Sequence, residues 1–368
     1  MSQKVFTGKN IKEGFIEIQK EKQVRNLFVV CGSFCKKLEI AKEILSLPAD
    51  EIWFSNFSPN PEYESVKKGV ELFREKGCDA VLAIGGGSAM DVAKCIKLYS
   101  SMDADKNYLE QQPQDNGVPL IAIPTTAGTG SEATRFAVIY YQGNKQSVTH
   151  DSIIPEYVFL KPEVLKELPE YQKKATMMDA MCHAIESFWS VNSTDESRIY
   201  STDAIKKIMS NMDGYLSGDE KAAEEMLIAA NTAGKAINIT QTTAGHAMCY
   251  KITSLYEISH GHAAALCVSK LWPYMIAHTA DCIDPRGKNH LERVLEELAD
   301  AFECESSEEA AENFGRILMK LDLNVPMIGS EEQLKVLVSS VNPTRLKNNP
   351  VLLTENTLKD LYIEILRN

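Results

Sequence analysis

Four side chains of the types that bind divalent metals are concentrated in the second half of the chain. Asp179 and His183 lie four residues apart in a segment of helical composition, so both project from one face of a helix. His246 and His260 follow in two short motifs, and the whole chain has only seven histidines. A single histidine is more often a packed core or surface residue, but this concentration favours a metal site. One carboxylate with three imidazoles is an O/N donor set suited to Fe(II) or Zn(II).

Two glycine-rich loops in the first half of the chain have the composition of a nucleotide site. The first is Gly85-Gly86-Gly87-Ser88, and the second is Pro124–Glu132, rich in Thr, Gly and Ser. Each follows a short apolar run that is typical of a buried parallel strand, so each lies at the carboxyl end of a strand, where open α/β sheets bind ligands. Glycine lets the backbone approach a pyrophosphate, and the amides that open a helix favour negative charge. The pattern indicates an enzyme that binds a nucleotide.

Ser88 and Asp91 also fit a capping box. In that interpretation Ser88 is the N-cap of the following helix and Asp91 occupies its third position. This structural role is compatible with phosphate binding, because a capped helix N-terminus is also an anion site.

The elements that carry these motifs change in type along the chain. β-rich runs at 27–31, 51–54, 80–84 and 119–123 alternate with helical segments, which predicts βαβ crossovers and a parallel sheet. Two β-rich runs within 136–160 flank 142–145 and predict a hairpin that returns to this sheet. Beyond 169 the composition predicts helices only, at 172–191, 196–213, 219–238, 261–280, 288–303, 307–321, 331–340 and 355–367.

Length supports a two-domain division. A chain of 368 residues exceeds the size at which single cores usually split. We therefore expect an α/β dinucleotide-binding domain at 1–168, and an all-helical metal-binding and catalytic domain at 169–368.

Composition limits the partners and the compartment. The net charge of -12, with no basic run, argues against nucleic acid or an anionic membrane as a partner. The nine cysteines are scattered, without metal-ligand spacing, which favours a reducing compartment. The chain opens without a signal peptide and has no uninterrupted apolar stretch of about 18 residues. These features predict a cytoplasmic protein that acts on a small molecule.

Taken together, these motifs resemble the iron-containing (group III) alcohol dehydrogenases over nearly the whole chain. The matching motifs, in the order and spacing of the family, are Gly85-Gly86-Gly87-Ser88 with Asp91, the loop Pro124–Glu132, Asp179-xxx-His183, His246-Ala247-Met248 and His260-Gly261. The fold of that family, shared with dehydroquinate synthase, is an α/β domain with a parallel dinucleotide-binding sheet followed by an all-α domain.

The resemblance implies roles for specific residues. It makes Asp179, His183, His246 and His260 the metal ligands, and it places catalysis in the cleft between the domains. The two loops would hold NAD(P), through Gly85, Gly86, Gly87, Ser88, Asp91, Thr125, Thr126, Thr129 and Ser131. We also expect a homodimer.

Two departures from the family pattern bear on the chemistry. Many members carry another histidine four residues after the third ligand, where this chain has Tyr250. Tyr250, His262 or an ordered water would then deliver the proton, and His262 is equally compatible with a packing role. NAD-specific relatives place an acidic residue at the end of the second strand, where it bonds the ribose and repels a 2′-phosphate. Ser55 stands there, which predicts that NADPH is accepted at least as well as NADH.

The stretches around 246–256 and 259–266 resemble the branch of the family that interconverts phosphonoacetaldehyde and 2-hydroxyethylphosphonate. A phosphonate dianion requires cationic partners, for which Arg135 is the first choice and Lys145 and Lys251 are the others. Each of them taken alone is more often a solvated surface cation.

Three other functions remain open. They are a general short-chain alcohol, butanol or diol dehydrogenase, an enzyme similar to glycerol dehydrogenase or dehydroquinate synthase, and a nucleotide-binding protein without catalytic activity. The last is disfavoured because all four ligand positions are filled.

Overall fold

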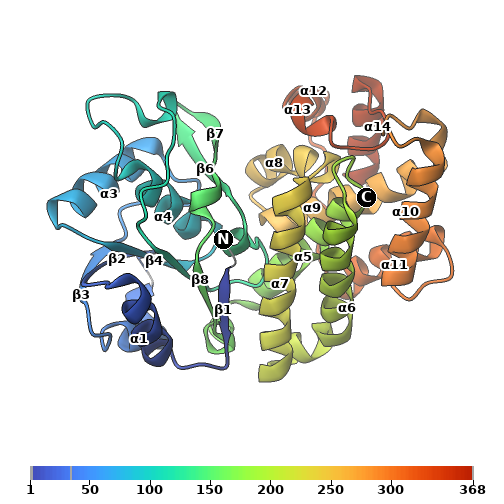
Figure 1. The fold of residues 1–368 in the computed structure, drawn as a ribbon. Helices are drawn as coiled ribbons and strands as arrows, with labels where there is room; N and C mark the ends of the chain where they lie inside the picture. Colours follow the sequence, from blue (N-terminus) through green and yellow to red (C-terminus); the bar gives the residue numbers. More distant parts are fainter. Residues whose placement is uncertain (1–2, 34, 367–368) are drawn as a thin grey trace. The chain divides into compact units, whose positions relative to one another are not determined.

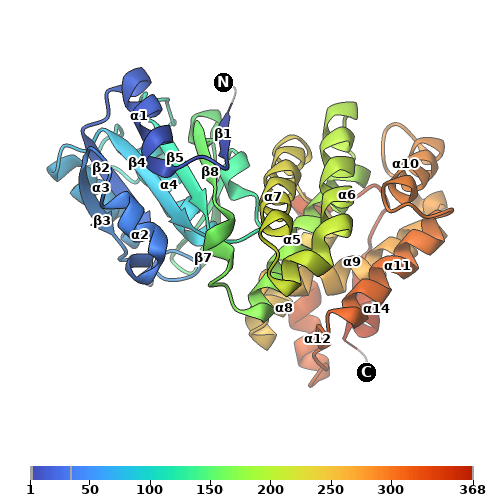
Figure 2. The ribbon, with the colours of Figure 1, turned by 90° about the horizontal axis from the view of Figure 1, so that it is seen from below.

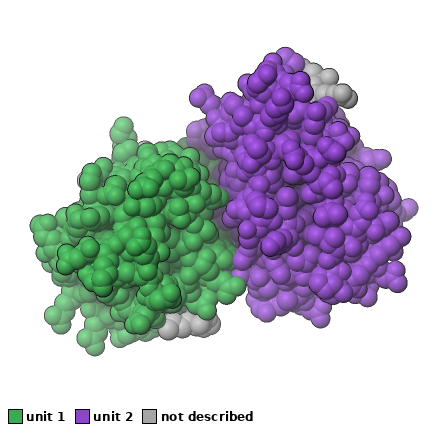
Figure 3. All heavy atoms as spheres, turned by 90° about the horizontal axis from the view of Figure 1, so that it is seen from above, with its two compact units in different colours: residues 1–126, 130–168 green, residues 127–129, 169–368 purple. Residues whose placement is uncertain are grey.

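The computed structural model describes residues 3–33 and 35–366. Two compact units make up the chain (Figure 3). Unit 1 comprises 1–126 and 130–168, and unit 2 comprises 127–129 and 169–368. The segment 127–129, in the middle of the second glycine-rich loop, therefore belongs to the unit that contains the candidate metal ligands.

Unit 1 contains a six-stranded sheet in which every pairing is parallel, as the sequence predicts. Apolar runs form its central strands, which are buried throughout because helices cover both faces. The strand order is β1-β8-β5-β4-β2-β3. The strands are β1 (Lys4–Thr7), β2 (Asn26–Cys31), β3 (Asp50–Phe54), β4 (Ala80–Gly85), β5 (Leu120–Pro124) and β8 (Tyr157–Leu160).

Helices flank this sheet. In Figure 1, α1 lies on one side of the strands, and α3 and α4 lie on the other. Their bounds are α1 (Ile11–Lys22), α2 (Glu39–Ile44), α3 (Tyr63–Glu75) and α4 (Gly87–Tyr99). The helix α4 follows β4 directly, so the glycine turn joins a strand end to a helix N-terminus, as a phosphate site requires.

The predicted hairpin forms, but the prediction that it returns to the main sheet is wrong. β6 (Phe136–Tyr141) and β7 (Asn144–Thr149) pair antiparallel in a separate two-stranded sheet. Gln142 and Gly143 both have positive φ, of 51° and 74°, which suits a two-residue turn that pairs β6 with β7. The strand that does join the main sheet is β8, which comes after the hairpin.

Unit 2 is helical, and its centre is the long helix α5, which packs against α6, α7 and α9 (Figure 2). Two of its helices, α8 and α13, were not predicted from the sequence. The helices are α5 (Glu170–Trp189), α6 (Asp195–Ser217), α7 (Glu220–Thr240), α8 (Ala244–Tyr256), α9 (His260–Ala277), α10 (Lys288–Ala301), α11 (Ser307–Lys320), α12 (Glu331–Ser339), α13 (Pro343–Leu346) and α14 (Glu355–Ile365). Within the described residues, none of the helices has the length and apolar character needed to cross a bilayer.

Candidate metal and dinucleotide sites

One buried face of α5 carries the first set of polar groups. Asp179 and His183 are both buried, although the surrounding stretch of α5 is almost entirely apolar. Glu186 lies one turn further along and is completely buried. Residues at this spacing share one side of a helix, so the three side chains enter the same interior region. Buried carboxylates in an apolar helix require partners, because an unpaired buried charge is costly.

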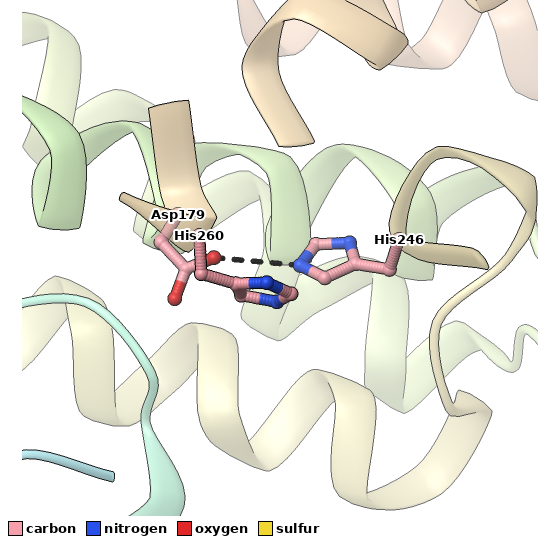
Figure 4. A group of neighbouring side chains, drawn as sticks. All are labelled: Asp179, His246 and His260. Carbon is pink, nitrogen blue, oxygen red and sulfur yellow. Dashed lines mark ion pairs between the residues drawn. The ribbon is translucent and has the colours of Figure 1, made fainter. Parts of the chain in front are cut away.

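Three predicted ligands converge from three helices (Figure 4). Asp179 comes from α5, His246 from the first turn of α8, and His260 from the first position of α9. One ligand atom of each lies within 4.8 Å of the others. Nε2 of His246 and Oδ1 of Asp179 form an ion pair at 3.4 Å. We refer to Asp179, His246 and His260 as the metal triad.

The fourth predicted ligand, His183, stands outside this group. Its ring stacks on the ring of His246, with centroids 4.5 Å apart and an angle of 15° between the planes. The structure therefore brings His183 beside the metal triad without placing its ring nitrogen among the mutually close ligand atoms.

Glu186 holds His246 and was not predicted from the sequence. Its Oε1 accepts hydrogen bonds from the backbone amide of Thr243 at 3.0 Å, from the Thr243 hydroxyl at 2.6 Å, and from the amide of His246 at 3.2 Å. Its Oε2 bonds Nδ1 of the His246 ring. Because Nδ1 donates to the carboxylate, Nε2 is the ring nitrogen that faces Asp179. Helical spacing was an available signal, because Glu186 lies three residues after His183.

The charges in this region favour an ionised carboxylate beside a cation. Burial raises the pKa of Asp179, but His183, His246 and His260 outweigh that effect and hold it below its usual range. Burial lowers the pKa of His183 to about 4, so its ring is neutral at pH 7. For His246 the effect of burial is reversed by Glu186 and Asp179, which raise its pKa to about 9. The carboxylates of Glu186 and Asp179 thus favour a positive charge on the His246 ring.

Unsatisfied polar atoms support a cation site. Oδ1 of Asp179, Nε2 of His246 and Nδ1 of His183 are buried without a hydrogen-bond partner. Buried polar atoms nearly always make hydrogen bonds, so the lack of one at Asp179 Oδ1 and His246 Nε2, which face each other at 3.4 Å, is compatible with a cation between them. The donors are a carboxylate oxygen and imidazole nitrogens, which fit Fe(II) or Zn(II).

The two predicted proton donors lie in different surroundings. The ring of Tyr250 is 5.0 Å from that of His260, beside the metal triad. Burial raises the pKa of Tyr250 well above its usual value, so it is a neutral phenol at pH 7. His262 packs edge-on against Tyr171, and its Nδ1 is 3.1 Å from the Tyr171 hydroxyl. That contact is what a packing role of His262 requires.

The two glycine-rich loops lie at the ends of adjacent strands. Gly85 ends β4 and pairs with Pro124 at the end of β5, and its carbonyl accepts a hydrogen bond from the Thr125 amide at 3.1 Å. Gly85 has a φ of 152°, and a Cβ there would lie 2.6 Å from that of Ala89, so a side chain does not fit. Thr126 faces Gly86 across the turn, because its side chain would lie 3.5 Å from a Cβ at that position.

The predicted capping box at Ser88 is wrong. α4 begins one residue earlier, at Gly87, and its N-cap is Gly86, which makes no side-chain cap bond. The turn at Gly85 starts the helix before Ser88 can cap it. Asp91 instead bonds the Ser131 hydroxyl of the second loop, at 3.3 Å. Burial raises the pKa of Asp91 to about 6.

Lys94 ties α4 to the second loop. Its ammonium group is completely buried and donates to the Ser131 hydroxyl, to the Thr134 carbonyl and hydroxyl, and to the Phe136 carbonyl, at 2.7–3.2 Å. Burial lowers the pKa of Lys94 to about 8. Asp91 and Lys94 thus connect the helix that follows the first loop to the far end of the second.

The predicted substrate and ribose residues occupy several elements. Arg135 pairs with the exposed Asp151 at 3.2 Å, and Lys145 on β7 lies close enough for its charge to act on Asp91. Lys251 follows Tyr250 in α8 and is half-buried. Ser55 is exposed directly after β3, the strand at the sheet edge.

Comparison with known proteins places these features in a family. The family model described as iron-containing alcohol dehydrogenase matches residues 2–162. The model described as Fe-containing alcohol dehydrogenase family, C-terminal, matches residues 173–366. The two matches cover nearly the whole chain, including the glycine-rich loops and the metal triad.

Individual relatives agree with these matches. Phosphonoacetaldehyde reductase of Streptomyces viridochromogenes is 34% identical over 250 residues, 64% of this chain and 63% of that protein. Lactaldehyde reductase of Escherichia coli is 32% identical over 266 residues, 69% of this chain and 66% of that protein. The alignments thus span slightly less than two thirds of each relative. The structure of sulfoacetaldehyde reductase from Bifidobacterium kashiwanohense in complex with NAD⁺ has a TM-score of 0.89 at 26% identity, and covers 100% of this chain and 97% of that one.

Proposed function

Because the chain belongs to the iron-containing alcohol dehydrogenase family, we propose that it is a metal-dependent oxidoreductase that interconverts a small aldehyde and its primary alcohol with NAD(P)H. The observation that carries the proposal is the metal triad, in which a buried carboxylate oxygen and a buried imidazole nitrogen lack hydrogen-bond partners. His183, stacked on His246, would complete the donor set.

The reaction places definite demands on the site. A bound NAD(P)H would supply hydride to the carbonyl carbon, and the negative charge left on the oxygen would require a proton to complete the alcohol. A divalent cation supplies Lewis acidity toward that oxygen. Glu186 fixes the orientation of the His246 ring, and Asp179 contributes the negative charge that retains a cation. Tyr250 and His262 are the proposed proton donors, with an ordered water as the alternative.

The dinucleotide would bind unit 1. The turn after β4 offers backbone amides at the start of α4, and the loop after β5 offers the hydroxyls of Thr125, Thr126 and Ser131. Lys94 and Asp91 hold these loops together through Ser131, so the cradle is fixed before a ligand arrives. A rigid cradle lowers the entropic cost of binding.

We propose phosphonoacetaldehyde, reduced to 2-hydroxyethylphosphonate, as the substrate. The relatives named for phosphonoacetaldehyde and sulfoacetaldehyde support this choice, because both aldehydes carry an acidic group one carbon away from the carbonyl. Charge-assisted hydrogen bonds contribute roughly 1.5–3 kcal/mol each, so two of them would favour this aldehyde over propanal by about a hundredfold or more in kcat/KM. Arg135, Lys145 and Lys251 are the cations proposed from the sequence.

A panel of aldehydes tests the proposal. Phosphonoacetaldehyde, sulfoacetaldehyde, lactaldehyde and propanal are each assayed with NADH and NADPH, on protein stripped with a chelator and reloaded with Fe(II) or Zn(II). We expect turnover only in the reloaded protein and the highest kcat/KM for phosphonoacetaldehyde. Preference for propanal or lactaldehyde would leave a general short-chain alcohol dehydrogenase. Absence of turnover with every aldehyde would contradict the proposed activity itself.

A further inference from the structure

A cation that sequence reasoning did not single out lies beside Tyr250, which neighbours His260 of the metal triad. Arg345, on the short helix α13, places its guanidinium carbon 5.4 Å from the ring centre of Tyr250. The Tyr250 ring is in turn 5.0 Å from the ring of His260. Arg345, Tyr250 and the triad therefore form a continuous series of neighbours inside unit 2.

This guanidinium lacks the partner that the comparable side chains have. Between 169 and 366, the other arginines, Arg198, Arg286, Arg293 and Arg316, each form an ion pair with Asp or Glu. Arg345 has no carboxylate within ion-pair distance among the described residues, although it is half-buried. Its one hydrogen bond to a described residue is from Nη1 to the Thr242 hydroxyl, at 2.6 Å. Because a guanidinium has five N–H donors, most of its donors remain available.

The position of Arg345 is fixed by its surroundings. Thr242 is buried, and its carbonyl accepts a hydrogen bond from Asn348 at 3.1 Å, which fastens the chain after α13 to the loop before α8. The next residue, Thr243, bonds Glu186, which holds His246. Thr242, which bonds Arg345, is thus adjacent in sequence to Thr243, which bonds the carboxylate that positions His246. The aromatic face of Tyr250 attracts the guanidinium without neutralising its charge.

We propose that Arg345 binds the anionic group of the substrate, a phosphonate or a sulfonate one carbon away from the aldehyde. This inference rests on the proposed function and adds the specificity-determining residue. A planar guanidinium donates two parallel hydrogen bonds to such tetrahedral oxyanions, and a half-buried position strengthens them. Tyr250, as a neutral phenol, provides the surface between the anion and the metal triad.

The test compares two charge-removing variants on one segment. Arg345→Gln removes the proposed anion-binding group, and Lys347→Gln removes an exposed charge two residues away. On metal-loaded protein, calorimetry measures binding of methylphosphonate and of methanesulfonate, which identifies the preferred oxyanion. We expect about ten- to hundredfold weaker binding in Arg345→Gln and unchanged binding in Lys347→Gln. Arg345→Lys keeps the positive charge but loses the pair of parallel N–H donors, so it should bind the two anions with intermediate affinity.

Steady-state kinetics supply a second measurement. In Arg345→Gln, kcat/KM for phosphonoacetaldehyde should fall at least tenfold more than kcat/KM for propanal. Equal losses for the two aldehydes, or equal anion affinities in Arg345→Gln and Lys347→Gln, would overturn the inference. Failure of the wild-type protein to reduce any aldehyde would instead count against the proposed function, while the calorimetric comparison would still decide the role of Arg345.

Discussion

The candidate site consists of a few polar residues in an apolar interior, and each has an identifiable reason to be there. Asp179 is kept ionised by the surrounding imidazoles, and His246 is oriented by Glu186. Neither arrangement would be retained for packing alone, since buried charged groups rarely add net stability over apolar residues. The proposed cation would account for both.

Removing His246 tests the metal assignment. His246→Ala deletes one member of the metal triad and leaves Asp179, His260 and His183 as the remaining proposed ligands. We expect loss of bound metal and of aldehyde reduction, with the helical circular dichroism spectrum largely unchanged. His278→Ala, which alters a histidine stacked on Tyr274, is the control and should keep its metal. Stoichiometric metal in purified His246→Ala would sink the assignment.

Glu186 should tune the affinity for the metal. Glu186→Gln keeps the shape but places a neutral amide against Nδ1 of His246, which weakens the bond that orients the ring. Loss of such a supporting carboxylate typically costs about 10–100-fold in metal affinity. Competition with a chelator measures the change independently of catalysis. Glu170→Gln, at the exposed start of the same helix, is the matched control. An unchanged chelator midpoint in Glu186→Gln would show that the carboxylate does not position His246.

At the scale of elements, the sequence predicts best those features that local pattern determines. An apolar run marks the strand at 80–84, and a composition rich in Ala, Met, Lys and Glu marks the helix beginning near 172. α8 was missed because Gly245 lies in its first turn, and because its start is held by the bond from Thr243 to Glu186, a contact between distant residues. The same limit applies to Arg345, whose importance depends on its nearness to Tyr250 and not on any local motif.

The contact between α5 and α9 should be intolerant of added volume. A Cβ at Gly261 would lie 2.1 Å from the Ala175 carbonyl oxygen and 2.5 Å from Cβ of Asp179. Both neighbours are fixed to the α5 backbone, so Gly261→Ala must push α9 away and carry His260 with it. We expect a loss of about 1–3 kcal/mol in unfolding free energy together with lower metal content.

Urea unfolding and metal analysis test this prediction against a matched substitution. Gly315 lies inside α11, and a methyl group added there would meet no described atom within 4 Å. Gly315→Ala should therefore be neutral or stabilising by up to about 1 kcal/mol. If Gly261→Ala is as stable and as metal-rich as Gly315→Ala, close packing of α9 on α5 is not needed to place His260.

At the scale of the whole molecule, the net negative charge opposes the binding of anionic ligands, so positive groups must be placed locally at the binding sites. The chain carries a net charge of -12, yet the proposed cofactor and substrate are both anionic. A uniform negative field disfavours such ligands, so selection depends on local groups such as the amides at the start of α4 and the guanidinium of Arg345. NADPH is the most highly charged of these ligands, so its binding is the strongest test of whether local groups overcome the net negative charge.

We expect NADPH to be accepted at least as well as NADH. Ser55 is exposed after β3, and the segment 55–60, Ser-Asn-Phe-Ser-Pro-Asn, contains no carboxylate to repel a 2′-phosphate. Ser55→Asp should shift the ratio of kcat/KM for NADH over NADPH by about tenfold or more, because one new negative charge would face the extra phosphate. The test is to measure kcat/KM for NADH and for NADPH at fixed ionic strength. Ser58→Asp is the control for a charge added to the same segment. A tenfold preference of the wild-type protein for NADH would show that Ser55 does not select the cofactor.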